Sequence, residues 1–147
     1  MYSKILVATD GSPLSKKAVA SALQWAVTCG AELIAMKVVP RYPQAYFEGS
    51  IPLTAEEISR VESQWTAAAE SQLAAVAKAA KAKGVTCKAV TVKSDVVSDA
   101  IIATANKHKA DLIVMASHGR KGIKRLLLGS ETQQVLTHTT LPVLVLR

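Results

Sequence analysis

Short apolar runs alternate with longer amphipathic segments along the whole chain. Several of these runs, such as "DLIVMAS" at residues 111–117, lack a polar residue at every second position, which is typical of strands buried on both faces. The predicted strands are residues 4–10, 31–39, 85–92, 111–117 and 141–147, and the predicted helices are 15–28, 54–83, 94–107 and 130–139. Strands that alternate with helices predict a five-stranded, mostly parallel, doubly wound α/β sheet of the Rossmann-like type.

The size of the chain fits one domain that spans residues 1–147. Half of the residues are hydrophobic but only 4% are aromatic, which suits helices packed on a buried sheet better than an aromatic-rich barrel. Residues 40–53 contain three of the five prolines, so we expect a loop within the domain there.

The predicted helices carry recognisable end signals. Gly30 stops the first helical pattern as a C-cap would, and Thr54 with Glu57 forms a capping-box pattern. Candidate N-caps for the other two helices are Ser94 or Asp95, and Ser130.

Several classes of protein are disfavoured by the sequence. The start lacks the apolar core and cleavage site of a secretory signal, and no segment reaches the roughly 20 apolar residues of a membrane span. Cys29 and Cys87 have neither a CxxC spacing nor a neighbouring histidine pattern, so we expect small buried side chains there and no metal site. We therefore expect a cytoplasmic protein without a membrane partner.

The net charge of +7 favours an anionic partner. Charge alone does not choose among a nucleotide, a nucleic acid and a membrane surface. A nucleic-acid partner is disfavoured, because interleaved aromatic residues and a recognition motif are missing.

Two loops are expected to meet at the ligand-binding edge of the sheet. Sheets of this class bind ligands outside the carboxyl ends of the strands, where the strand order reverses. With the order 3-2-1-4-5, taken from fold analogy, Asp10 after the first strand would lie beside the glycine-rich loop after the fourth. Asp10 precedes Gly-Ser-Pro, so ligand binding and turn or helix capping are both open for it.

The loop after the fourth strand has the composition of an anion site. Gly119 and Gly129 frame nine residues, and Ser130 follows at a predicted helix start, where free amides favour phosphate. Four cations of this loop would add positive charge: Arg120, Lys121, Lys124 and Arg125. The alternative is a purely structural turn, with Leu126, Leu127 and Leu128 in the core or against a partner. The segment is neither a Walker A loop nor a GxGxxG fingerprint.

The segments "ILVATDGS", "DLIVMASHGRKGIKRLLLGSETQQVL" and "PVLVLR" closely resemble the universal stress protein family, and the resemblance covers the whole chain. It implies the five-stranded fold, a homodimer and, in one branch of the family, an ATP site. The nucleotide motif of that branch reads G, two residues, G, nine residues, G and then Ser or Thr. Here Ala116 replaces the first glycine, and whether its methyl group would crowd a nucleotide is open.

The resemblance also implies roles for individual residues. Ala8 and Thr9 would lie near the base or sugar, Asp10 would bind the ribose hydroxyls, and Val38 would offer backbone groups to the adenine edge. The residues expected to present backbone amides to the phosphates are Gly119, Gly129, Ser130 and Glu131, and Arg120 is a further candidate. The remaining nucleotide-binding positions implied by the motif are Ala116, Ser117 and His118. Magnesium or manganese would arrive with ATP, without a dedicated metal site.

The function expected from this resemblance is that of an ATP-responsive sensor or regulator. No residue is assigned a catalytic role, because His118 lacks an identifiable nucleophile and orienting acid. At most, slow ATP hydrolysis or self-phosphorylation is expected. The alternative, which Ala116 favours, is a nucleotide-independent dimeric module that recruits an unknown protein partner, with the C-terminal strand as the dimer edge.

Overall fold

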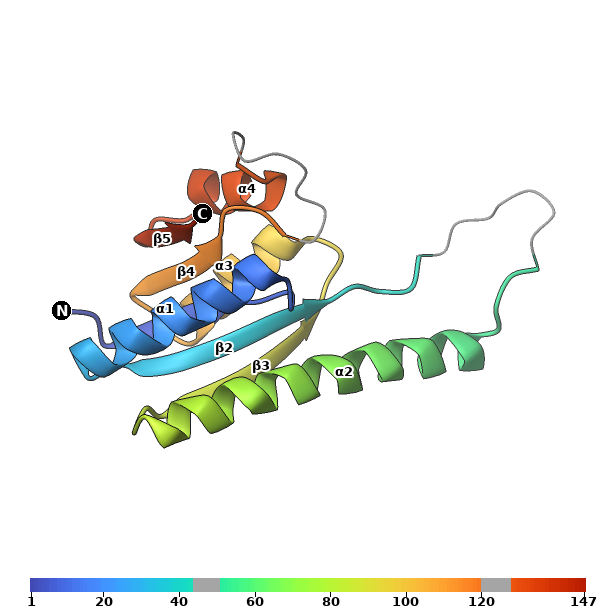
Figure 1. Ribbon diagram of the computed structural model, residues 1–147. Coiled ribbons are helices and arrows are strands. Elements are labelled where there is room, and N and C mark those ends of the chain that lie inside the picture. Colours follow the sequence, from blue (N-terminus) through green and yellow to red (C-terminus); the bar gives the residue numbers. More distant parts are fainter. Residues whose placement is uncertain (44–50, 120–127) are drawn as a thin grey trace.

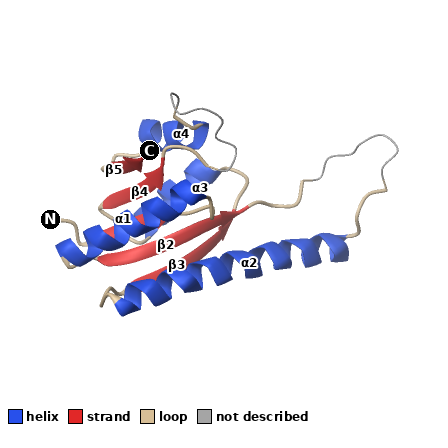
Figure 2. Cartoon of the chain, viewed as in Figure 1, coloured by secondary structure: helices blue, strands red, loops and turns tan. Residues whose placement is uncertain are grey.

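Figure 1 shows the computed structural model of the chain, which describes residues 1–43, 51–119 and 128–147. The described residues form five strands and four helices that alternate along the sequence, as the apolar pattern predicts (Figure 2). In chain order the elements are β1 (Lys4–Ala8), α1 (Pro13–Cys29), β2 (Glu32–Val39), α2 (Ala55–Ala82), β3 (Cys87–Lys93), α3 (Val97–Lys107), β4 (Leu112–Ala116), α4 (Ser130–His138) and β5 (Val143–Leu146).

The strands form one parallel sheet in the order β3-β2-β1-β4-β5, which confirms the predicted order. The strand β1 lies at the centre, where Val7 is in register with Ala35 of β2 and Val114 of β4. The chain moves outward from β1 to β3 on one side and from β4 to β5 on the other. The strand order therefore reverses between β1 and β4. Sheets of this class bind ligands at the carboxyl ends of the strands beside such a point.

Helices cover both faces of the sheet and explain why the strands lack polar alternation. The helices α1 and α2 pack on one face, where Ile5 and Val7 of β1 join their core. On the other face, Leu6 and Ile113 pack in a second core with Ile101 of α3 and residues of α4. Successive side chains of a strand point to opposite faces, so a strand between two cores is apolar at every position.

Helix termini agree with the sequence at two positions. Gly30 ends α1 with φ +66°, the left-handed conformation that glycine adopts at low cost. Thr54 and Glu57 form the predicted capping box at the start of α2, with bonds of 3.2 and 2.7 Å.

The prediction that Ser94 or Asp95 caps α3 is wrong. Val96 holds the N-cap position, and its side chain has no oxygen to accept a hydrogen bond. The Ser94 hydroxyl instead accepts the Val96 N–H at 3.2 Å, and the Asp95 carboxylate accepts the Arg41 N–H at 3.2 Å. Both candidates are used to fix the chain before the helix begins.

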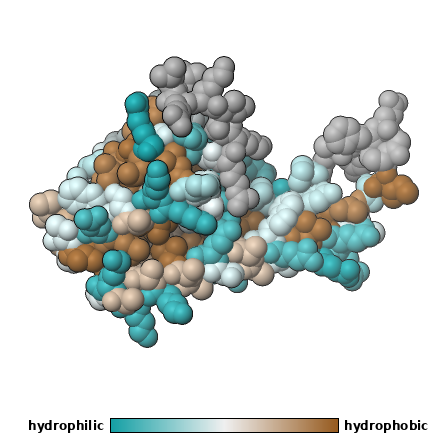
Figure 3. Space-filling model, viewed as in Figure 1, coloured by the Kyte–Doolittle hydropathy of each residue, from teal (hydrophilic) through white to brown (hydrophobic). Residues whose placement is uncertain are grey.

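The long helix α2 extends beyond the sheet at its N-terminal end (Figure 1). Tyr42, after β2, stacks on Trp65 of α2 with ring centroids 6.2 Å apart, and its N–H donates to the Glu62 carboxylate at 2.9 Å. Figure 3 shows apolar surface over this projecting part, mixed with hydrophilic side chains.

Of the predicted loop at residues 40–53, positions 44–50 lie outside the described residues. Among the described helices, none has the length and apolar character needed to cross a bilayer.

Candidate functional site

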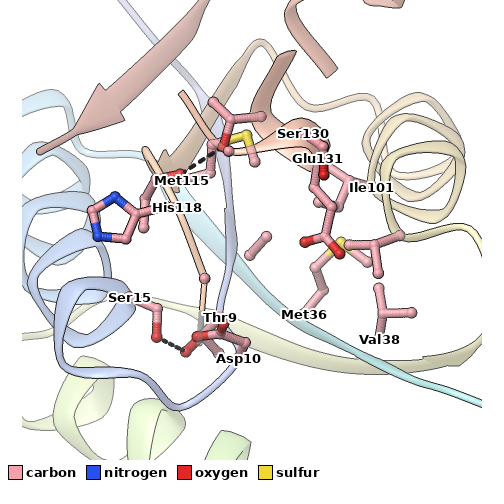
Figure 4. A pocket seen from close by; sticks show the side chains of 16 residues that line it. Thr9, Asp10, Ser15, Met36, Val38, Ile101, Met115, His118, Ser130 and Glu131 are labelled. Carbon is pink, nitrogen blue, oxygen red and sulfur yellow. Dashed lines mark hydrogen bonds between the residues drawn. The ribbon is translucent and has the colours of Figure 1, made fainter. Parts of the chain in front are cut away.

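A pocket of about 350 Å³ lies at the carboxyl ends of β1, β2 and β4, at the point where the strand order reverses (Figure 4). Of the eleven predicted site residues that the structure describes, ten line it. Those that do are Ala8, Thr9, Asp10, Val38, Ala116, His118, Gly119, Gly129, Ser130 and Glu131. The lining also contains six residues that the sequence did not predict: Ser15, Met36, Val97, Ile101, Met115 and Thr132.

Asp10 both shapes the turn after β1 and faces the glycine loop. Its Oδ1 accepts the Ser12 N–H at 2.9 Å, while Ser12 itself caps α1 by accepting the Ser15 N–H at 3.2 Å. A Cβ atom placed on Gly119 would lie 2.6 Å from the Asp10 Oδ2. The two predicted neighbours therefore meet, and only a residue without a side chain allows this approach.

Thr9 is fixed at the end of β1 by both neighbouring elements. Its N–H donates to the Met36 carbonyl at 3.0 Å, and its hydroxyl lies 3.0 Å from the Ser15 hydroxyl (Figure 4). Ser15 is buried in the first turn of α1. This hydroxyl pair sets the floor of the pocket beside Asp10.

The backbone of Val38 faces the space that β1 leaves when it turns toward α1. The Val39 carbonyl accepts the Ser94 N–H on the β3 side, and the Met36 carbonyl accepts the Thr9 N–H on the β1 side. Because backbone groups alternate between the two neighbours of a strand, those of Val38 point to the β1 side. The register of β1 with β2 ends at Met36, so the Val38 groups lie beyond it.

Ala116 ends β4 in ordinary backbone geometry. Among the described residues, Lys109 is the one residue other than glycine with positive φ, so Ala116 does not occupy a conformation that needs glycine. Its carbonyl accepts the buried Thr132 hydroxyl at 2.9 Å, which ties the first turn of α4 to the sheet. The fold therefore accommodates the alanine without backbone strain.

Gly129 has a packing role that differs from the predicted one. Its N–H, predicted to face phosphate, donates to the Ser117 carbonyl at 2.7 Å, and an added Cβ would lie 3.1 Å from that oxygen. Gly129 also takes the N-cap position of α4, so the prediction that Ser130 caps this helix is wrong. Ser130 begins the helix, and the first-turn amides of a helix have no acceptor within it. The amides of Ser130 and Glu131 are therefore the better candidates for an anion.

Ser117 does not line the pocket, although it belongs to the predicted motif. It is buried, its N–H donates to the Leu146 carbonyl at 2.7 Å, and its hydroxyl lies 3.1 Å from the His118 Nδ1. Arg120 lies outside the described residues, as do Lys121, Lys124, Arg125, Leu126 and Leu127.

Apolar side chains line the side of the pocket opposite the loop, formed by β2, β4 and α3. Met36 and Val38 stand on the same face of β2, two residues apart, and Ile101 belongs to α3 (Figure 4). An apolar wall opposite polar sugar and phosphate groups is suited to a planar base. The described residues contain no cluster of three metal-ligating side chains.

Comparisons with known proteins agree with this architecture. The sequence profile of the universal stress protein family matches residues 1–147. A universal stress protein of Methanocaldococcus jannaschii, MJ0531, is 34% identical over an alignment of 149 positions that covers 100% of this chain and 83% of the relative. The chain therefore belongs to the universal stress protein family.

Two solved structures extend the likeness to three dimensions. The universal stress protein UspA of Lactobacillus plantarum has a TM-score of 0.83 and 25% identity, with 99% of this chain and 98% of that chain covered. A universal stress protein in complex with cAMP has a TM-score of 0.72 and 31% identity, with 99% and 97% covered.

Proposed function

We propose that this universal stress protein is a regulator or sensor that binds an adenine nucleotide, ATP above all, in the pocket between β1 and β4. The observation that carries the proposal is the set of groups that surround the pocket. An apolar wall includes Met36, Val38 and Ile101, and the start of α4 and Asp10 lie on different sides of the pocket. A base, a ribose and a phosphate group require these three kinds of surface.

Each part of the nucleotide then has a matching group. The Asp10 carboxylate would accept hydrogen bonds from ribose hydroxyls. Hydrogen bonds to such a charged acceptor are stronger than those to a neutral one. The first-turn amides of Ser130 and Glu131, with the positive end of the α4 dipole, would bind phosphate. The complex of a 31% identical family member with cAMP supports an adenine nucleotide as the ligand class.

We expect binding rather than fast catalysis. Rapid phosphoryl transfer needs a positioned base or water and a metal held against the phosphates. Magnesium or manganese would enter with ATP. Any hydrolysis or self-phosphorylation would be slow, and a single-turnover assay with labelled ATP would measure it.

Calorimetric titration of ATP with magnesium into nucleotide-stripped protein tests the proposal. AMP and GTP serve as comparisons, and Asp10→Ala as the control for the site. Saturable binding of ATP that the substitution weakens about tenfold or more is the expected result. Absence of heat and of any thermal shift would contradict it and favour a nucleotide-independent function, which the motif position of Ala116 also favours.

In either function we propose a homodimer formed through β5. The Pro142 and Leu146 carbonyls bond to β4, so by alternation the backbone groups of Val143 and Val145 face outward from the sheet edge. The nearby Leu136 side chain on α4 is 41% exposed, and apolar surface gathers in this region (Figure 3). An apolar edge strand of this kind is completed by pairing with a second copy.

A cytoplasmic location stays a prediction, which cell fractionation would test.

A further inference from the structure

The first turn of α4 contributes a carboxylate to the pocket. Glu131 lines the pocket, and Figure 4 shows its carboxylate projecting toward the side formed by Met36 and Val38. The next residue, Thr132, instead directs its hydroxyl to the Ala116 carbonyl at 2.9 Å. The side chain of Glu131 is therefore directed to the apolar side of the pocket, while its own amide belongs to the anion-binding helix start.

A carboxylate in this place favours one kind of ligand group. An ionised carboxylate only accepts hydrogen bonds, and it repels phosphate and carbonyl oxygens. On the apolar wall of the pocket the ligand group is the base and not the phosphate. Adenine carries an amino group at position 6, which donates, whereas guanine and hypoxanthine carry an oxygen there, which accepts.

We infer that Glu131 selects the base by accepting a hydrogen bond from the 6-amino group of adenine. This inference rests on the proposed nucleotide binding and adds to it the residue that sets base specificity. An exocyclic amino group has two protons, so the Val38 backbone carbonyl can accept one and the Glu131 carboxylate the other. A base with oxygen at position 6 meets two acceptors at once, which is an arrangement that discriminates strongly between ligands.

A simpler role for Glu131 is to stabilise α4 through the helix dipole. The chain offers a matched control for that role. Glu56 lies in the first turn of α2, is exposed, and faces Arg60 at 4.0 Å. It has the same charge at an equivalent helix position and does not line the pocket.

The experiment compares two ligands that differ only in the 6-amino group, AMP and purine riboside 5′-monophosphate. Calorimetry gives the ratio of their affinities for the unmodified protein, for Glu131→Ala and for Glu56→Ala. We expect the preference for AMP to fall about tenfold in Glu131→Ala and to stay unchanged in Glu56→Ala. Glu131→Gln keeps a neutral acceptor, so its preference should fall between the two.

The outcomes separate this inference from the proposed function. If neither ligand binds the unmodified protein, the proposed function fails and the inference with it. If AMP binds but Glu131→Ala keeps the full preference, the proposed function stands and Glu131 has only a structural role. A thermal melt of each variant shows that the protein remains folded in the assay.

Discussion

The close approach of Gly119 to Asp10 predicts that Gly119→Ala weakens ATP binding with little loss of folding stability. A Cβ at position 119 would lie 2.6 Å from the Asp10 Oδ2, closer than packed atoms come, so the carboxylate must move in Gly119→Ala. The displaced atom is the end of a side chain, which can move. The free energy of unfolding should therefore fall by less than about 1 kcal/mol, which is the low end of the usual cost of overpacking. Asp10 would lose its hydrogen bonds to ribose, and bonds to a charged group contribute about 1.5–3 kcal/mol.

This loss corresponds to a fall in ATP affinity of roughly 10- to 100-fold, measured by calorimetry. Gly30→Ala is the matched control. Gly30 has φ +66° with no atom near its added Cβ, so alanine there should cost about 1–2 kcal/mol of stability and leave the affinity unchanged. Chemical denaturation measures both free energies of unfolding.

A double-mutant cycle tests the cause of the effect. If the added methyl acts by displacing the carboxylate, Gly119→Ala should weaken ATP binding little further in protein that already carries Asp10→Ala. A loss of the same size in both backgrounds would refute the reasoning, as would unchanged affinity in the single variant.

Three further perturbations have defined outcomes. Val145→Pro removes an outward-facing N–H of β5, so sedimentation should show monomers; an unchanged dimer would exclude this edge. Burial alone would raise the pKa of Asp111, but N–H groups at the start of β1 hold it below its usual value. The stability that Asp111 contributes is thus present above about pH 4 and lost as the pH falls through that lowered pKa. In Asp111→Asn the free energy of unfolding should depend less on pH in this acid range, and an unaltered pH dependence would contradict this. Thr132→Val leaves the Ala116 carbonyl without its hydroxyl donor and should cost about 1–3 kcal/mol in denaturant melts; unchanged stability would show that this bond is dispensable.

The strands were predictable because a parallel strand between two helical layers is apolar on both faces. Residues 111–117 show this most clearly, and the structure places Leu112–Ala116 there as a fully buried strand. The strand order came from fold analogy, since a sequence pattern does not record which strands pair. The N-cap of α3 was missed because Ser94 and Asp95 bond to nearby backbone instead.

Some residues that line the pocket could be predicted from the local sequence pattern, and others depend on how distant elements pack together. Met36 could have been found from Val38, because residues two apart share a face of a strand. Val97 and Ile101 could not, because only the packing of α3 beside β2 brings them to the pocket. The bonded amide of Gly129 likewise depends on how the chain returns to Ser117, which spacing alone does not specify.

The location of the nucleotide is tested most directly by amide NMR of isotopically labelled protein during titration with ATP and magnesium. The proposed function predicts saturable shifts at the Thr9, Gly119 and Glu131 amides, with little change at Cys87, which begins the edge strand β3 at the opposite end of the sheet. Shifts that leave the pocket amides unchanged, or that concentrate on β5, would show that the pocket between β1 and β4 is not the nucleotide site.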